Sequence, residues 1–224
     1  MSSHPEDAAN SLEIHPEVEP EGVGSYFGFQ RNAMRYFVEL LCHEGLERGL
    51  VGPKEPARIW SRHILNCAVL SDFLPECTSV ADVGSGAGLP GLVLAIARPD
   101  LDVTLIESMD KRCQWLEWVS AELDLDNVRV LRARAEDLHG KEHFPFVTAR
   151  AVGNLSTLLG WVAPLVRPKG TMLFLKGESV AGEVEAAKQH NVFRKCHVTF
   201  PEILEVATPV TGEITRVARL TKHS

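Results

Sequence analysis

Three glycines alternate with other residues in one short segment, Asp82-Val83-Gly84-Ser85-Gly86-Ala87-Gly88-Leu89-Pro90-Gly91. Glycine tolerates positive φ and lets a ligand approach the backbone, so this spacing is typical of a binding turn. Apolar residues precede the segment, and Pro90 suits the first turn of a helix. We therefore expect a strand, a turn and a helix, at the strand end where open α/β sheets bind ligands. A tight connection without a ligand is the simpler alternative.

Two classes of ligand compete for this turn, dinucleotides and S-adenosylmethionine. Gly86 to Gly91 match the dinucleotide pattern Gly-x-Gly-x-x-Gly, but counted from Gly84 the last glycine position is occupied by Leu89. Asp82 would repel a pyrophosphate, whereas it would attract the ammonium and sulfonium groups of S-adenosylmethionine. Helix amides remain available for the carboxylate of that cofactor. We therefore predict that Asp82, Gly84 and Gly86 belong to an S-adenosylmethionine site.

An acidic residue, Glu107, follows Gly84 by 23 residues. It stands at the end of the second predicted strand, where an acceptor can pair with both ribose hydroxyls of a nucleoside. A solvated acid at a strand end is the alternative. The spacing favours a cofactor-binding role for Glu107.

Short apolar runs alternate with amphipathic segments from residue 79 onward. The predicted strands are Ser79–Val83, Val103–Ile106, Val128–Leu131, Phe146–Ala149 and Met172–Leu175. The predicted helices are Pro90–Ala97, Lys111–Leu123, Leu155–Val166 and Val180–Gln189. This alternation indicates a parallel sheet with right-handed crossovers. Two further strands, Val192–Phe200 and Ile214–Leu220, have no crossover helix between them and predict a terminal antiparallel hairpin.

Charge is unevenly distributed over the 224 residues. The chain carries 30 acidic residues against 23 Lys and Arg, and six of the acids lie in residues 1–22, which hold no Lys or Arg. The remaining chain carries 24 acids against 23 bases and is nearly neutral. The first segment, rich in Pro, Ser and Ala, is typical of a disordered tail. The net charge of −7 therefore excludes neither RNA nor small-molecule partners.

Two helical segments precede the first predicted strand. Ala33, Phe37 and Leu40 follow helical spacing, and a second helical pattern runs from Pro56 to Leu74. We therefore divide the chain into a disordered acidic tail (residues 1–24), N-terminal accessory helices (25–76) and one α/β domain (77–224).

Composition and cysteine spacing suggest the compartment. No run approaches the roughly 18 apolar residues that cross a bilayer, and the first residues lack the pattern of a signal peptide. The five cysteines are scattered and never form a Cys-x-x-Cys pair, which argues against a disulfide framework and against a zinc site. We expect a cytoplasmic, metal-free protein without a membrane span.

Further motifs accompany the glycine turn along the chain. They are Trp60-Ser61-Arg62-His63-Ile64-Leu65-Asn66, Lys111-Arg112, Arg134-Ala135-Glu136, Thr148-Ala149-Arg150-Ala151-Val152 and Leu175-Lys176-Gly177. Their order and spacing, over most of residues 25–220, resemble the RsmG or GidB family of small-subunit (16S) ribosomal RNA guanine-N7 methyltransferases. The family pattern often has Phe where Leu89 stands and Asp where Asn66 stands.

The resemblance implies a class I S-adenosylmethionine-dependent methyltransferase fold, which is a Rossmann-like α/β fold. Such a fold has a seven-stranded sheet with an antiparallel last strand. The resemblance also implies cofactor contacts at Gly84, Leu89, Ala135, Glu136 and Arg150. Formation of 7-methylguanosine in 16S rRNA, with the small ribosomal subunit or its 16S rRNA as partner, is the implied function.

Methylation at guanine N7 requires no general base, because N7 offers a lone pair and carries no proton. Alignment of the reacting atoms can supply roughly 7–11 kcal/mol. Arg150 and Lys176 end the fourth and fifth predicted strands and are the catalytic candidates: we expect Arg150 to orient donor and substrate, and Lys176 to grip RNA. Surface salt bridges are the alternative for both. For Trp60, Arg62 and His63, substrate binding and helix packing both remain open.

Rival functions remain open at this stage. The same fold serves methyltransferases that act on other RNAs, on proteins or on small molecules, and a noncatalytic S-adenosylmethionine-binding regulator is a third possibility. The loop after the fourth strand lacks the Asn/Asp-Pro-Pro-aromatic motif of exocyclic-amine methylation, and no cysteine stands at a strand end for pyrimidine carbon-5 methylation. The sequence specifies neither the nucleotide nor whether naked rRNA suffices, and we expect a monomer.

Overall fold

A single twisted sheet organises the chain in a computed structural model that describes residues 15–224. Its seven strands lie in the order β3-β2-β1-β4-β5-β7-β6. They are β1 Ser79–Val83, β2 Asp102–Glu107, β3 Val128–Arg132, β4 Phe144–Arg150, β5 Val166–Lys176, β6 Glu202–Ala207 and β7 Ile214–Thr221. The first five are parallel, whereas β7 runs antiparallel to both β5 and β6. The predicted α/β class and the antiparallel last strand are thus confirmed.

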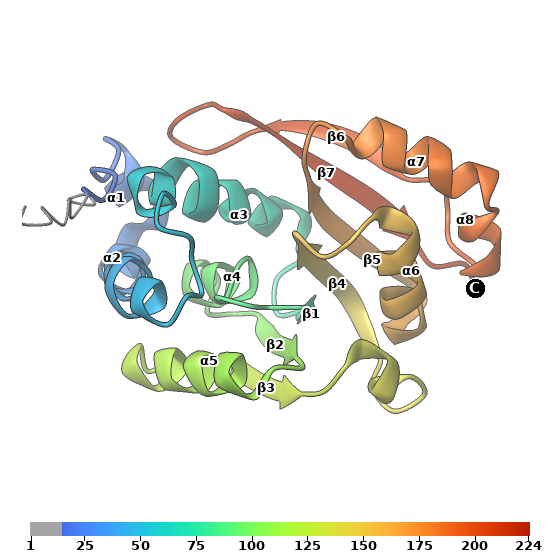
Figure 1. Cartoon of the computed structure of the whole chain (residues 1–224), viewed down its shortest axis with the longest axis horizontal. Coiled ribbons are helices and arrows are strands. Elements are labelled where there is room, and N and C mark those ends of the chain that lie inside the picture. The colour runs from blue at the N-terminus through green and yellow to red at the C-terminus, as the bar shows by residue number, and fades with distance from the viewer. Residues whose placement is uncertain (1–14) are drawn as a thin grey trace, which may run out of the picture.

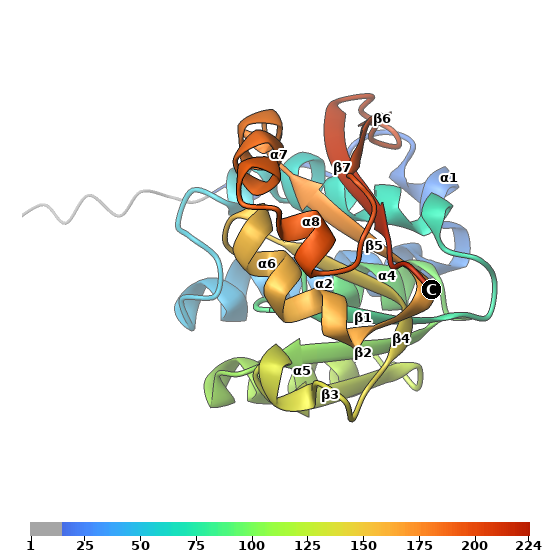
Figure 2. The same cartoon turned by 90° about the vertical axis from the view of Figure 1, so that its right-hand side faces the viewer.

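Helices cover both faces of the sheet (Figure 1). One layer holds α4 Gly91–Ala97 and α5 Asp110–Glu122 together with the accessory helices. The other holds α6 Leu155–Val162, α7 Val180–Gln189 and α8 Val192–Lys195, which group together in the turned view (Figure 2). Each layer has its own apolar cluster against the sheet, so the strands are buried on both sides as parallel strands require.

The chain order of the strands fixes where a ligand can bind. β2 and β3 lie on one side of β1, and β4, the next strand in the sequence, lies on the other side of β1. The connections that leave β1 and β4 therefore diverge, and a crevice opens between them at the carboxyl ends. The glycine-rich turn follows β1 and borders this crevice.

The accessory helices share a core with the sheet. They comprise α1 Val23–Phe27, a 3-10 turn Gly28–Gln30, α2 Arg31–Leu40 and its π-helical extension Leu41–Gly45, followed by a helical run made of η3 Pro56–Arg58, η4 Ile59–Leu65, α3 Asn66–Ala68 and η5 Val69–Phe73. Met34, Phe37 and Ile64 are fully buried in one cluster with Leu92 and Leu94 of α4. The boundary drawn at residue 76 therefore does not separate two cores.

The predicted disordered tail does not extend to residue 24. Residues 1–14 lie outside the described part, but Glu17 donates its backbone N–H to Pro56 O at 2.8 Å. Its carboxylate accepts the Ser61 N–H at 3.0 Å. Glu19 pairs with Arg31 and Arg35 of α2 at 2.7 and 3.0 Å. Residues 15–22 thus form a strap, which is a segment held against the accessory helices. The acidic side chains that indicated disorder in the sequence accept a backbone N–H or pair with arginines of these helices.

Two element boundaries differ from the prediction near the C-terminus. The predicted strand Val192–Phe200 is wrong: the segment forms the helical turn α8, and β6 begins at Glu202. β6 already pairs with Ile214 to Arg219 of β7, so the segment before β6 meets only the last residues of β7, where the Thr199 N–H donates to Thr221 O at 2.9 Å. Only Val198 forms a bridge, to Lys222, while Phe193 is buried under α6 and α7. β5 is also longer than expected, and α6 correspondingly ends at Val162.

Within residues 15–224 no helix combines the length and the apolar character needed to cross a bilayer.

A truncation series tests the strap. Deleting residues 1–21 removes the bonds made by Glu17 and Glu19, whereas deleting residues 1–14 removes none of the described contacts. We expect the longer deletion to lower the Tm by about 4–8 °C relative to the shorter one. The two hydrogen bonds of Glu17 contribute about 1 kcal/mol each, the exposed ion pairs of Glu19 add little, and 1 kcal/mol shifts the Tm of a chain of this length by about 2–4 °C. Differential scanning calorimetry measures the difference, and equal Tm values would show that the strap is energetically neutral.

Candidate active site

The glycine-rich turn has the backbone that its glycines were expected to allow. Gly84, Gly86 and Gly88 have φ of +73°, +56° and +98°. A Cβ on Gly84 would lie 2.8 Å from Val152 Cγ2, and one on Gly88 would lie 2.3 Å from Leu92 Cδ1. At these positions conformation and space both demand glycine.

Asp82 occupies a different place from the predicted one. It is only 1% exposed, and its Oδ2 accepts the Gly91 N–H at 3.0 Å, behind the turn. Burial raises the pKa of this carboxyl to about 7, against the opposing effect of the Gly91 hydrogen bond. The carboxylate does not line either cavity beside the turn. The prediction of a direct cofactor contact is therefore not met, and Asp82 instead fixes the start of α4.

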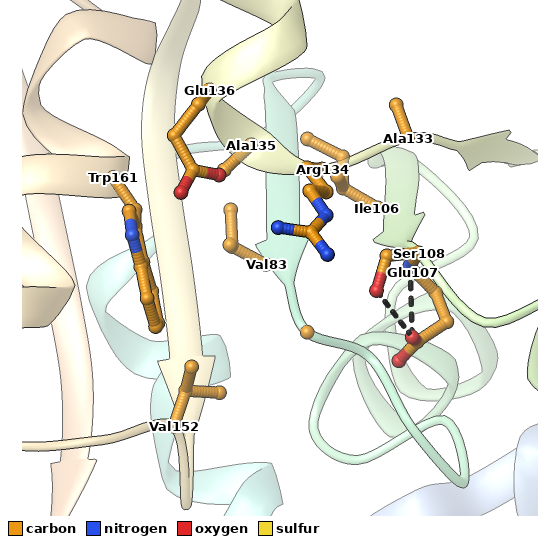
Figure 3. A pocket seen from close by; sticks show the side chains of 11 residues that line it. Val83, Ile106, Glu107, Ser108, Ala133, Arg134, Ala135, Glu136, Val152 and Trp161 are labelled. Carbon is orange, nitrogen blue, oxygen red and sulfur yellow. Dashed lines mark hydrogen bonds between the residues drawn. The ribbon is translucent and has the colours of Figure 1, made fainter.

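A cavity of about 250 Å³ lies at the carboxyl ends of β1 and β2, bordered by the segments that follow β3 and β4. Trp161 and Val152 stand on one side of it, and Glu107 and Ser108 stand on the opposite side (Figure 3). The remaining lining residues are Val83, Gly84, Ile106, Ala133, Arg134, Ala135 and Glu136. One apolar aromatic wall facing one carboxylate suits a nucleoside, which has a flat base and a polar sugar.

Glu107 lies where the sequence placed it and is held rigidly. The side chain is 3% exposed. Its Oε2 accepts the Gly86 N–H at 3.1 Å, and its Oε1 accepts those of Ser108 and Met109 at 2.8 and 2.9 Å. Ser108 Oγ also approaches Oε1, at 3.5 Å, so Oε2, which accepts one hydrogen bond, is the oxygen with capacity for a ligand hydroxyl. The preorganised oxygens face the cavity, as ribose binding requires.

Ala135 and Glu136 form the far end of the same cavity. They open the 3-10 turn η6 Ala135–Leu138, and the first amides of a helical turn have no partner within it. These N–H groups are therefore available to the edge of a base. Trp161, which faces them from α6, was missed by the sequence analysis because it belongs to no motif and follows the apolar spacing of an ordinary packing residue.

A second cavity, of about 570 Å³, continues from the first. Gly84, Glu107, Val152 and Trp161 line both. It extends along the turn and reaches Arg150 and the accessory helices, with Ser85, Gly86, Ala87, Leu89, Arg112, Glu55 and His63 among its lining residues. The structure thus brings together the predicted residues of the turn with Glu107 and Arg150, and it adds Glu55, which no motif indicated.

Arg150 is held by groups from the accessory helices. Its Nη2 donates to His63 Nδ1 at 2.8 Å and to Arg62 O at 3.3 Å. Its Nη1 contacts Cys67 Sγ at 3.6 Å. The guanidinium lies at the border of the second cavity and a third one, of about 400 Å³, since it lines both. Arg150 is therefore placed where donor and acceptor sites can meet.

Lys176 lines the third cavity but is not a free cation. Its Nζ donates to Glu183 Oε2 at 2.9 Å and to Gly153 O at 3.3 Å, and its side chain is 8% exposed. Glu183 also accepts the N–H of Leu155, the first residue of α6. The salt-bridge alternative therefore describes Lys176 better than the predicted grip on RNA. The pair ties α7 to the loop that follows Arg150.

Cations without a protein partner do occur at this edge. Arg62 is exposed and lines the third cavity with Asn66, whose Nδ2 donates to Thr215 Oγ1 at 2.6 Å. Among residues 15–224 the Arg62 guanidinium forms no ion pair. Over the same residues, no cluster of three or more His, Cys, Asp or Glu side chains could hold a metal ion.

Comparison with known sequences gives one consistent family. The model of the family described as rRNA small subunit methyltransferase G matches residues 30–208. A Nocardioides protein named ribosomal RNA small subunit methyltransferase G is 59% identical over 67% of this chain and 60% of its own length. Namesakes from Clavibacter sepedonicus and Thermobifida fusca are 46% and 42% identical, over 91% and 99% of this chain and 95% and 87% of their own lengths.

Comparison with solved structures supports the fold. An M. jannaschii TYW2 structure in complex with AdoMet has a TM-score of 0.54 at 18% identity, covering 73% of this chain and 76% of that one. A SAM-dependent O-methyltransferase from Thermotoga maritima has a TM-score of 0.55 at 14% identity, covering 76% and 71%. At these identities the likeness concerns the arrangement of elements alone.

Glu107→Gln tests the predicted sugar-binding role of this carboxylate. The change removes a charged acceptor and disturbs the bonds from Gly86, Ser108 and Met109. We expect S-adenosylmethionine to bind about 10- to 100-fold more weakly by calorimetry, because a hydrogen bond to a charged group contributes about 1.5–3 kcal/mol. Glu117→Gln, an exposed acid on α5, is the matched control. Equal affinities for the two variants would remove Glu107 from the site.

Asp82→Asn tests the buried carboxyl through pH. The folded pKa of about 7 exceeds the ordinary value of 3.8, so the native state binds the proton more tightly than the unfolded state. The contribution to stability is complete below pH 3.8 and is lost as the pH rises through about 7. Urea unfolding should show the wild type losing stability relative to Asp82→Asn over that interval, and parallel pH profiles would contradict it.

Proposed function

The chain belongs to the rRNA small subunit methyltransferase G family, and on that premise we propose that it methylates N7 of a guanine in small-subunit (16S) ribosomal RNA with S-adenosylmethionine as donor. The observation that carries the proposal is the convergence of the glycine turn, Glu107, the Ala135–Glu136 amides and Arg150 on two continuous cavities. The partner is then the small ribosomal subunit or its 16S rRNA. A monomeric, metal-free enzyme in the cytoplasm accords with this substrate.

The residues present fit S-adenosylmethionine. In the first cavity Glu107 would accept a ribose hydroxyl, the amides of Ala135 and Glu136 would donate to the adenine edge, and the Trp161 ring would lie beside the base. In the second cavity the backbone of Gly84 to Leu89 would hold the amino-acid end, with a close approach that the absent Cβ of Gly84 permits. S-adenosylmethionine supplies a methyl group on a positively charged sulfur when it is bound.

The acceptor chemistry places few demands on proton transfer. N7 attacks with a lone pair, and the positive charge passes from sulfur to the base without release of a proton. The one imidazole beside Arg150, that of His63, has hydrogen-bond partners at both ring nitrogens, which accords with a reaction that uses no general base. Holding N7 in line with the methyl group is the main task of the protein.

The third cavity is the natural entrance for the acceptor. It adjoins the donor cavities at Arg150, and it opens between the accessory helices and β7. N7 lies on the major-groove edge of guanine, which is hard to reach in an RNA duplex because that groove is deep and narrow. A guanine outside a duplex therefore suits this cavity, and the unpaired Arg62 that lines it suits the adjoining phosphate. Arg150, which can donate to O6 beside N7, orients the base.

Methyl transfer to small subunits from cells that lack the modification tests the proposal. Labelled methyl should enter 16S rRNA, and nucleoside mass spectrometry should identify it as 7-methylguanosine. A different methylated nucleoside would reject N7, labelled protein would indicate another substrate class, and tight cofactor binding without any transfer would indicate a regulator.

Arg150→Ala should lower kcat by about 100-fold or more, because an unoriented acceptor loses part of the alignment energy. Arg194→Ala, an exposed cation on α8 remote from the cavities, is the control. Full transfer by Arg150→Ala would refute the orienting role.

A further inference from the structure

His63 occupies a position that the methyl-transfer scheme does not use. It lies on η4 of the accessory helices, is 8% exposed, and lines the second cavity. Its Nδ1 contacts Arg150 Nη2 at 2.8 Å, and its Nε2 contacts Glu55 Oε2. Both ring nitrogens thus connect a catalytic candidate to a carboxylate from the segment just before η3.

The partners determine the protonation of the ring. A guanidinium only donates, so Nδ1 must offer its lone pair to Arg150. The pKa of Glu55 is lowered, because the hydrogen bonds from Arg58 and His63 outweigh the effect of burial, which acts to raise it. Ionised Glu55 accepts, so Nε2 carries the proton. Burial, and next the charge of Arg150, lower the pKa of His63 to about 4, which agrees with a neutral ring.

Among the described residues, the hydrogen bonds of the Arg150 side chain all go to the accessory helices and none goes to the sheet. Arg62, His63 and Cys67 hold its terminal nitrogens, and all three belong to the helical run that precedes β1. Backbone position alone leaves a long side chain with many rotamers. The site of the guanidinium is therefore set by the accessory helices.

We propose that His63, oriented by Glu55, is a positioning residue that fixes the Arg150 guanidinium between the donor cavities and the acceptor cavity. The inference rests on the proposed function, in which Arg150 orients the acceptor base. The accessory helices then contribute to catalysis as well as to packing, since they supply His63 Nδ1, the acceptor atom that orients the Arg150 guanidinium. Glu55 contributes by fixing the tautomer and the plane of the ring.

A double-mutant cycle tests whether His63 acts through Arg150. We expect His63→Ala to lower kcat for methyl transfer to small subunits about 30-fold, with the calorimetric Kd for S-adenosylmethionine changed less than about 3-fold. His63→Asn keeps an acceptor near the position of Nδ1 and should retain kcat within about 5-fold of the wild type. The double variant His63→Ala/Arg150→Ala should be no slower than Arg150→Ala alone, because the two residues form one unit.

The control is His43→Ala, an exposed histidine on the extension of α2. Multiplicative losses in the double variant would overturn the proposal, as would full kcat in His63→Ala. Failure of the Asn variant to recover kcat, with its fold and Kd intact, would contradict it equally.

Nuclear magnetic resonance of the imidazole nitrogens provides a readout that needs no acceptor. The wild-type ring should carry its proton on Nε2 and titrate near pH 4. The charged groups that face it are Arg150 from β4, Glu55 with its partner Arg58, and Arg62 on its own helix. Arg150→Ala should raise the pKa of His63, and an unchanged pKa would show that the two side chains are not coupled.

The two measurements separate the hypotheses. If the wild type leaves small subunits unmethylated while the imidazole titration responds to Arg150→Ala, the proposed substrate fails and the pairing stands. If the subunits are methylated but the two substitutions lower kcat multiplicatively, the proposed substrate stands and the positioning role of His63 fails.

Discussion

Two buried carboxylates hold the turn between β1 and α4, and the rest of the site depends on them. Glu107 accepts the Gly86 N–H inside the turn, and Asp82 accepts the Gly91 N–H where α4 begins. Both acids stand at the ends of neighbouring parallel strands, so the sheet itself sets their separation. With the turn fixed at both ends, its positive-φ glycines become one defined surface for a ligand. The cost is a buried carboxyl whose pKa is raised to about 7.

The accessory helices connect this surface to the third cavity. Their core is continuous with that of α4 and α5, and residues 15–22 strap them from outside. Arg150 leaves the sheet at the end of β4, yet its terminal nitrogens meet only atoms of the helical run. Lys176 and Glu183 then fix the loop after Arg150 to α7. The border between the second and third cavities is thus assembled from both helical layers.

The sequence predicted those helices and strands whose residues carry a clear apolar periodicity or glycine spacing. The periodicity of apolar residues and the glycine spacing predicted the strand ends, the turn and α7. The distance in sequence from Gly84 predicted the position of Glu107. The errors have tertiary causes. Val192–Phe200 has the composition of a strand, but β6 already occupies most of the β7 edge beside it. Glu17 and Glu19 resemble a solvated tail in the sequence, although Ser61 and Arg31 lie beside them in the fold. Asp82 and Lys176 stand at the predicted edge, but their rotamers point to protein partners. Trp161 and Glu55 carry no motif at all, so only packing places them.

A shared core joins the two walls of the third cavity. The helices that carry Arg62 and Asn66 bury their apolar side chains in the same cluster as Leu175 of β5 and Val217 of β7, which stand at the opposite wall. Moving one wall away from the other would therefore disrupt a close-packed interior. The protein therefore meets its substrate with a preformed opening. The conformational work of recognition falls on the nucleic acid, whose own flexibility then decides which nucleotide can reach the donor.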